Sequence, residues 1–143
     1  MASKTDNGLA KTLAAMDRAR RAPREAVRPA LIKAGHNLAD AIELLAQRSR
    51  DTGALIDSIS VTLPGRATPP YSQPGGSHVA GETEVIVTVG DADVRYAHLV
   101  EYGTVDTEAQ EFFWPAFRLT RDQNERALTR AAKKAVKDAW KKQ

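Results

Sequence analysis

Residues 96–117, YAHLVEYGTVDTEAQEFFWPAF, decide the fold of this chain, because they join a tight aromatic turn to the start of a helix. Residues 94–102 place large side chains at every second position, as a strand does, and they equally fit one helical turn that ends at Gly103. We expect a third strand that runs into a short helical turn. Pro115 then suits the first turn of the last helix, where its missing N–H has no intrahelical partner.

Long helices are predicted on both sides of this segment. Between Pro23 and Ser49, apolar residues recur every three or four positions, which is the stripe of a long amphipathic helix. Pro23 is expected to separate that helix from a short N-terminal arm or helix in residues 1–22 and to leave one domain over residues 23–143. The chain after Pro115 carries the apolar face of the last helix.

The segment between the helices changes to a period of two, which predicts strands. Residues 59–63 and 84–89 each alternate, and residues 64–83 between them contain four prolines and four glycines. The prediction is an α+β domain, in which a long amphipathic N-terminal helix and a C-terminal helix pack on a small antiparallel sheet with a long hairpin loop. Gly53 and Gly103 each follow an element that must end, so we expect a positive φ angle at both.

The loop over residues 64–83 is unusual for a compact domain, because 20 residues without regular structure are most often functional or disordered. Ordering them costs roughly 1–2 kcal/mol per residue in backbone entropy, a cost that the prolines reduce. Only Tyr71, Val79 and a few alanines and prolines can bury apolar area there. We therefore expect a neighbouring subunit or another protein to hold the loop, with Tyr71 as the anchor.

The net charge of +3 hides a strong segregation along the chain. Residues 1–50 carry ten basic and five acidic side chains, residues 51–117 carry two and ten, and residues 118–143 carry nine and three. Such asymmetry can order subunits by placing the acidic body of one against the basic helices of the next. Two alternatives stay open, namely solvated helix faces around an acidic sheet and DNA binding by the basic ends.

Catalytic and metal sites are not indicated by any motif. The chain has no cysteine, which removes disulfides and thiolate chemistry, and His36, His78 and His98 fall in three different elements. Asp91 and Asp93 fit an ordinary turn better than a metal loop. We expect no enzyme activity, no cofactor and no metal site. The absence of an apolar run near the roughly 18 residues of a membrane span, or of a secretory signal, predicts a soluble cytosolic product with no membrane partner.

Glu101 follows two apolar residues and is expected to be partly buried. A buried carboxylate needs a partner, and Arg95 is one of only two cations in residues 51–117. The glutamate is then a fixed polar anchor of the turn or part of a salt bridge between subunits. The alternative is an exposed glutamate on a helical turn, and neither interpretation makes it catalytic.

Four of the eight aromatic side chains fall at Phe112, Phe113, Trp114 and Phe117. Helix geometry makes it hard to bury all four in one monomer, so we expect them to form part of a partner surface. The alternative is that all four close the core of the domain.

Three motifs follow one another along the chain: DTGALIDSI at 51–59, YAHLVEYGT at 96–104 and AQEFFWPAF at 109–117. In this order they resemble the head–tail joining (neck and tail-completion) proteins of long-tailed phages, whose patterns are T-G-x-L-x-x-S-I, Y-A-x-x-V-E-[FY]-G-T and A-Q-P-F-[LF]-x-P-A. Glu111 stands where this family commonly has proline, and Trp114 where a basic residue is frequent. The link into the last helix is therefore expected to bend differently here.

The resemblance implies a structural subunit of a phage neck. This subunit would form a homo-oligomeric ring between head-side connector or stopper proteins and the tail tube or tail terminator protein, with DNA passing through the lumen without sequence-specific binding. The protein would reside in the virion after assembly in the host bacterial cytoplasm. The alternative is a small basic nucleic-acid-binding or regulatory protein. The predicted interface residues are Tyr71, Tyr96, Glu101, Tyr102, Phe112, Phe113, Trp114, Arg130, Lys133 and Lys137.

Overall fold

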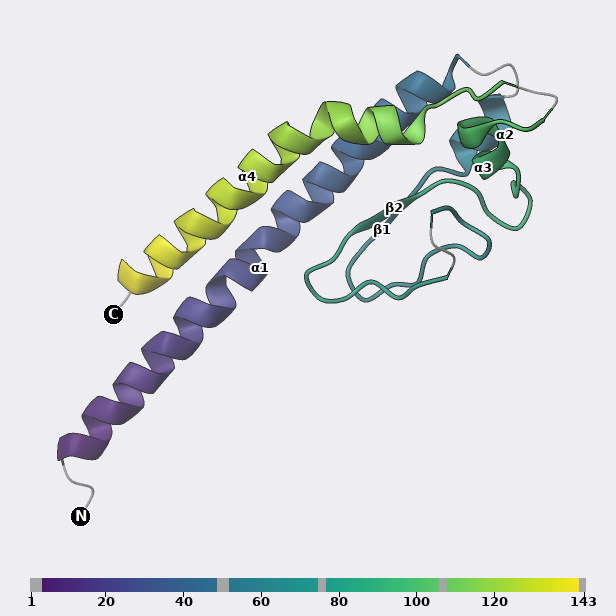
Figure 1. The fold of residues 1–143 in the computed structure, drawn as a ribbon. Helices are drawn as coiled ribbons and strands as arrows, with labels where there is room; N and C mark the ends of the chain where they lie inside the picture. The colour runs from purple at the N-terminus through teal and green to yellow at the C-terminus, as the bar shows by residue number, and fades with distance from the viewer. Residues whose placement is uncertain (1–3, 49–51, 75–76, 106–107, 142–143) are drawn as a thin grey trace.

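The computed structural model of the chain describes residues 4–48, 52–74, 77–105 and 108–141, except for the side chains of residues 4–7, Thr52 and His98. Two long helices lie side by side as a hairpin, and the short elements gather at one end of it (Figure 1). This arrangement confirms the predicted α+β class. The elements are α1 (Lys4–Ala46), α2 (Thr52–Asp57), β1 (Ser60–Thr62), β2 (Ile86–Thr88), α3 (Ala97–Tyr102) and α4 (Phe113–Lys141).

Helix α1 is longer than the sequence predicts, because it runs without a break through Pro23 and Pro29. The interruption predicted at Pro23 is therefore wrong. An interior proline costs about 3 kcal/mol in an unsupported helix. Here α4 packs along α1, and Ala22 and Ala26 line one hollow between the two helices together with Ala135 of α4. The division of the chain at residue 22 into an arm and a domain stays a prediction.

Helices α1 and α4 are also joined by a pair of asparagines that the sequence pattern does not reveal. The Asn37 side-chain amide donates to Asn124 Oδ1 at 3.3 Å, and the Asn124 amide donates to the backbone carbonyl of Ala34 at 3.3 Å. Polar groups that are partly buried between helices need such partners. The pair therefore fixes the register of α4 along α1 in the middle of the hairpin.

Strands β1 and β2 form the predicted antiparallel pair, with Val61 opposite Val87 at its centre. The third strand predicted within residues 94–102 does not form; within the described part of the chain, those residues give only the short helix α3. Helix α1 reaches the sheet at Gly35, where an added Cβ would lie 2.7 Å from Val85 Cγ1 and 3.1 Å from Val61 Cγ1. A glycine at this position therefore lets α1 approach the sheet closely.

The hydrophobic core lies where α1, α2, the sheet, α3 and the start of α4 meet. The far end of the hairpin contributes no residue to it among those that the structure describes. The core therefore fixes the globular end of the molecule and leaves the rest of the hairpin to pairwise helix contacts. Its buried members are Ile42, Ala46, Leu55, Val87, Val89, Val94, Ala97, Phe112, Phe113 and Ala116.

The described parts of the loop, residues 64–74 and 77–83, are held by its own domain, which corrects the expectation that this domain cannot order it. Gln73 exchanges two backbone hydrogen bonds with Val89, at 2.8 and 2.9 Å, and Ala80 N donates to the carbonyl of Arg66 at 2.8 Å. Counting apolar side chains missed this backbone pairing and the burial of small polar residues. Contact of the loop with a neighbour stays a prediction. The buried residues of the loop are Thr68, Ser72 and Ala80.

The two glycines expected at turns behave differently. Gly103 ends α3 with φ 74° and ψ 177°, and its N–H donates to the carbonyl of Leu99 at 2.8 Å, so the prediction is confirmed there. Gly53 lies inside α2 without a positive φ, so the prediction is wrong at that position. Gly90, which the sequence places in the turn after β2, also has a positive φ, of 94°.

Alanine substitutions at these two glycines are expected to change stability in opposite directions. Gly53→Ala should raise the free energy of unfolding by about 0.5–1 kcal/mol, because Gly53 is helical and an added Cβ meets nothing within 4 Å. Gly103→Ala should lower it by about 2 kcal/mol, because its backbone region is almost restricted to glycine. Urea denaturation of both variants checks the signs, and a destabilised Gly53→Ala would contradict the assignment.

Candidate functional site at the junction of α3 and α4

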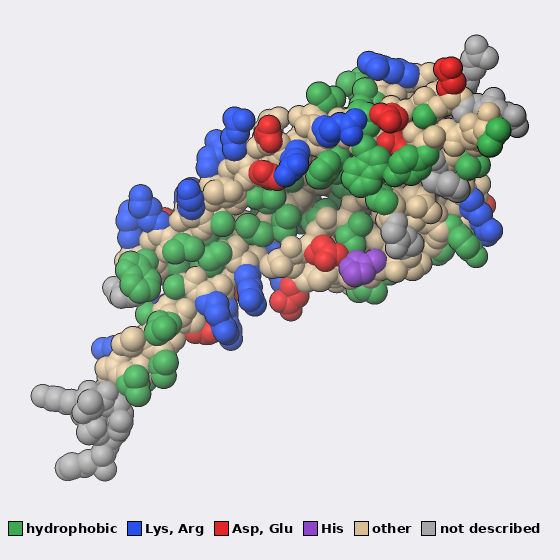
Figure 2. Space-filling view, in the orientation of Figure 1, with side chains coloured by type: hydrophobic (Ala, Val, Ile, Leu, Met, Phe, Trp, Pro, Cys, Tyr) green, Lys and Arg blue, Asp and Glu red, His purple; other side chains and the backbone are tan. Residues whose placement is uncertain are grey.

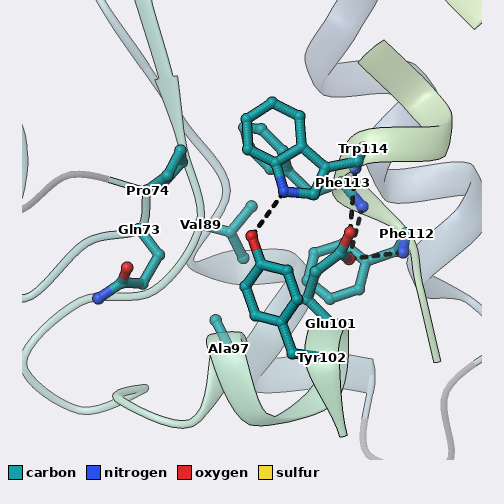
Figure 3. Close-up of a pocket in the computed structure, with 9 residues that line it drawn as sticks. All are labelled: Gln73, Pro74, Val89, Ala97, Glu101, Tyr102, Phe112, Phe113 and Trp114. Carbon is teal, nitrogen blue, oxygen red and sulfur yellow. Dashed lines mark hydrogen bonds between the residues drawn. The ribbon is translucent and has the colours of Figure 1, made fainter. Parts of the chain in front are cut away.

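Glu101 is the centre of the aromatic junction, where its carboxylate holds the first turn of α4 (Figure 3). Its Oε2 accepts hydrogen bonds from the backbone N–H groups of Phe112 at 2.8 Å and Phe113 at 2.9 Å, and its Oε1 accepts from Trp114 N at 3.1 Å. Only 4% of the residue is exposed. A side chain of α3 therefore caps a helix that begins 12 residues later.

The Glu101 cap supplies hydrogen-bond acceptors that the residues just before α4 lack. The first N–H groups of any helix lack intrahelical partners, and a Ser, Thr, Asp or Asn just before the helix usually accepts from them. Phe112 occupies that position here and has no acceptor. A carboxylate is the strongest substitute, because it makes charge-assisted bonds and lies at the positive end of the helix dipole.

Arg95 is not the partner of Glu101, which corrects the sequence-based expectation. The Arg95 guanidinium carbon lies 3.8 Å from the centre of the Tyr71 ring, in a cation–π contact. Tyr71 itself is more than half exposed and has a positive φ of 61°, which is strained for a non-glycine residue. Arg95 therefore belongs to the loop surface around Tyr71, and backbone N–H groups satisfy Glu101.

The end of the link between α3 and α4 contacts α3 again. Gln110 N donates to the carbonyl of Val100 at 2.8 Å, which brings the end of the link back onto α3. This contact and the turn at Gly103 place the first backbone N–H groups of α4 next to the Glu101 carboxylate. Pro115 falls in the first turn of α4, as predicted.

The four clustered aromatic side chains divide between the core and the surface. Phe112 and Phe113 are buried, Trp114 is partly buried, and Phe117 is 37% exposed. The Trp114 ring packs edge-on against Phe113, with ring centres 5.1 Å apart, and against Phe117 at 5.9 Å. The alternative that all four close the core is therefore not what the structure shows.

A small cavity of about 40 Å³ opens beside this cluster. Figure 3 shows Tyr102 and Trp114 facing each other across its mouth, and the indole N–H of Trp114 donates to the Tyr102 hydroxyl at 2.7 Å. Val89, Ala97 and the phenylalanines line its inner part. Its one charged group, the Glu101 carboxylate, already accepts three hydrogen bonds. The arrangement suits an apolar contact and offers no free acid, base or nucleophile.

Five of the predicted interface residues lie at the α3–α4 junction, and the others lie elsewhere. The five are Glu101, Tyr102, Phe112, Phe113 and Trp114. Glu101, Phe112 and Phe113 lie inside the domain, so they position the surface and are not offered to a partner. Tyr96 precedes α3 and packs against the core. The exposed members of the predicted set are Tyr71, Tyr102, Arg130, Lys133 and Lys137, and Trp114 is partly exposed.

Among the described side chains, the histidines and acidic residues considered from the sequence do not converge, and the side chain of His98 lies outside the described part of the structure. His78 Nε2 lies 3.0 Å from Glu84 Oε1 on the surface, and the Asp91 side chain accepts from the N–H groups of Asp93 and Val94 at 2.9 Å, as in an ordinary turn. No group of three His, Asp or Glu residues that could hold a metal ion occurs among the described residues. Within the same residues, no helix is long and apolar enough to cross a membrane.

Residues 9–103 match the family described as "Bacteriophage HK97-gp10, putative tail-component". The chain belongs to this HK97 gp10-like family. The matched part includes the motif at 51–59 and the motif at 96–104 except for Thr104, and it ends before the aromatic entry to α4. Comparison with curated proteins and with solved structures found no match.

Membership of the HK97 gp10-like family makes the chain a structural phage protein of the tail, from the region where head and tail join, and places it in the virion. The family is a structural component and is not known as an enzyme. The burial of Glu101 and its interpretation as a fixed polar anchor are confirmed, but its role as the cap of α4 was not predicted. The available signal was the lack of any capping side chain just before Phe113, combined with a glutamate between apolar residues on the preceding turn.

Proposed function

We propose that this HK97 gp10-like protein forms a closed homo-oligomeric ring in the phage neck. The ring would join the head-side connector or stopper proteins to the tail tube or tail terminator, assemble in the host cytoplasm and let DNA pass through its lumen. One observation carries the proposal beyond the family. Basic side chains follow α4, whereas residues 52–117 carry an acidic excess, so one copy can bind the next.

The basic surface follows one face of α4. Five cations recur at helical spacing, all five are exposed, and none of them forms an ion pair within the described residues. Figure 2 shows Lys and Arg side chains along this part of the hairpin. The stripe therefore has its whole charge available to a partner. Its members are Arg126, Arg130, Lys133, Lys137 and Lys141.

The acidic surface lies on the globular end, which we define as residues 52–117. Its exposed carboxylates include Glu82, Asp93, Glu108 and Glu111. Because the basic and acidic surfaces occupy different places on one subunit, a contact between them is heterologous and repeats from copy to copy. Such a contact closes into a ring when its rotation divides a full turn, which is the geometry that a conduit for DNA requires.

Charge reversal on the basic stripe is expected to weaken self-association. Replacing Arg130, Lys133 and Lys137 together with glutamate removes three attractive contacts and adds repulsion. Each exposed pair contributes about 0.2–1 kcal/mol, so the association constant should fall at least roughly tenfold at low salt. Light scattering coupled to size exclusion, over a range of protein and salt concentrations, measures the change. Reversing Lys33, Arg48 and Arg66, three exposed cations outside the stripe, is the matched control.

The same samples distinguish the alternative of a nucleic-acid-binding protein. A ring subunit should oligomerise and bind duplex DNA weakly, whereas a nucleic-acid-binding protein should stay monomeric or dimeric and bind tightly with a steep salt dependence. Assembly that is indifferent to salt and to the reversal would contradict the electrostatic contact. A wild-type protein that stays monomeric at every concentration, alone and with its partner proteins, would contradict the ring.

A further inference from the structure

The N-terminal part of α1 carries an apolar stripe that its own chain does not cover. Leu9, Leu13 and Met16 recur at helical spacing and are 57–60% exposed. The same spacing continues to Leu31 and Leu38, which are partly buried, and Leu38 packs against the core. Arg20 and Pro23 interrupt this face between Met16 and Leu31, so its apolar residues form two groups, one uncovered near the start of α1 and one partly buried at the globular end.

The end of α4 adds to this uncovered surface. Figure 1 shows that α1 extends past the C-terminal end of α4, and the sheet lies beside a later part of α1. Trp140 is 59% exposed and, together with Met16 and neighbouring residues of α1, lines a hollow of about 520 Å³. Val136 is 42% exposed one turn earlier. Apolar groups from both helices are therefore open to a partner here.

The charge around these apolar groups identifies the partner. We define the hairpin tip as residues 8–21 and 133–141, which carry eight basic and two acidic side chains, a net charge of +6. Figure 2 shows hydrophobic and basic side chains mixed along this end of the molecule. Two tips would repel each other, so the tip does not pair with a second tip. It fits a surface that is both apolar and acidic.

The globular end has such a surface beside the aromatic junction. Leu99, Tyr102 and Val105 are 43%, 65% and 104% exposed. The exposed carboxylates of Glu108 and Glu111 follow them along the chain, and that of Glu111 lies 3.8 Å from the Arg118 guanidinium. We propose that the hairpin tip of one copy docks on this surface of a second copy. The inference rests on the proposed ring and names the two surfaces that form its contact, namely Leu9, Leu13 and Met16 of α1 on one copy and Leu99, Tyr102 and Val105 on the other.

A pair of serine substitutions tests the contact without disturbing the fold. Leu9→Ser with Leu13→Ser should leave the thermal unfolding midpoint unchanged, because both side chains are exposed in the single chain. Self-association should weaken roughly a hundredfold, because each buried leucine contributes about a factor of ten. Leu44→Ser with Leu119→Ser is the matched control, since these leucines are 66% and 72% exposed outside the tip.

Disulfide cross-linking identifies the surface on the second copy. The natural chain has no cysteine, so a mixture of Leu13→Cys protein and Val105→Cys protein can form mixed disulfides only through the two introduced thiols. We expect the mixed dimer, which mass spectrometry distinguishes from the two homodimers, in this mixture, and no mixed dimer when Val105→Cys is replaced by His36→Cys, a position within α1. The dimer should disappear when the Leu13→Cys protein also carries Leu9→Ser and Met16→Ser.

The outcomes separate this proposal from the ring itself. If the wild-type protein oligomerises, the Leu9/Leu13 variant oligomerises equally well and no Leu13–Val105 cross-link forms, the docking proposal is wrong and the ring stands. A tip that proves necessary only for binding another protein of the neck leads to the same conclusion. A wild-type protein that never self-associates overturns both.

Discussion

Glu101→Ala is expected to lower the free energy of unfolding by about 4 kcal/mol, because it leaves three backbone N–H groups without an acceptor at the start of α4. Two of the three bonds are buried, so water cannot replace the carboxylate without opening the junction. The loss should appear as a lower urea midpoint and as a changed fluorescence of Trp114, whose position depends on the same turn. Glu101→Gln, which keeps one acceptor oxygen but loses the charge, should lie in between.

Glu108→Ala is the control for this substitution, because it removes an exposed glutamate from the link between the same two helices. Surface changes of this kind usually stay within about 0.5 kcal/mol. A loss below 1 kcal/mol for Glu101→Ala would show that the junction does not depend on the cap. Comparable losses at Glu101 and Glu108 would mean that the link as a whole, and not the capping bonds, stabilises α4.

Gly90→Ala is expected to cost about 3 kcal/mol for two reasons that act together. The residue has a φ of 94°, which side chains rarely adopt, and an added Cβ would lie 2.7 Å from the backbone carbonyl oxygen of Val94. That oxygen cannot move away easily, because it accepts a hydrogen bond from Asp91 N at 3.1 Å. The turn that joins β2 to α3 would therefore distort.

Gly65→Ala separates the two causes. Gly65 has a similar φ of 81°, but an added Cβ meets nothing within 4 Å. Its substitution should cost about 1 kcal/mol, the backbone contribution alone. Chemical denaturation of the two variants gives the difference, and equal losses at Gly90 and Gly65 would show that the close approach to Val94 can relax.

Most of the confirmed predictions depend on features that can be read along the chain without knowing which distant segments meet. Apolar spacing gave the two long helices, alternation gave the β1–β2 pair, and the order of three motifs gave the family. The wrong predictions, a helix break at Pro23 and a positive φ at Gly53, arose because the sequence does not show the tertiary surroundings of these residues. Whether a proline breaks a helix, or a glycine ends one, depends on what packs beside it, and here α4 lies along α1 while α2 continues through Gly53.

The sequence predicted which residues make up the candidate site, but it did not predict how they contact one another. The cluster of Phe112, Phe113 and Trp114 and the importance of Glu101 follow from the sequence, because an aromatic run and a glutamate between apolar residues are visible there. The partner chosen for Glu101 was wrong because a search for opposite charges overlooks backbone N–H groups. Backbone N–H donors are common to nearly all residue types, so the sequence does not distinguish them, and they are free to bind a side chain only where a helix starts.

The sequence by itself determined the fold class, the family and the separation of charge, since periodicity, motif order and net charge do not depend on how distant segments meet. Only the tertiary structure decided that Glu101 caps α4, that Gln73 pairs with Val89 to hold the loop, and that Leu9 and Leu13 stay uncovered. Each of these depends on which surfaces the folded chain brings together. The physical reason is that burial and hydrogen-bond satisfaction belong to the packed molecule, whereas hydrophobic patterning belongs to each segment alone.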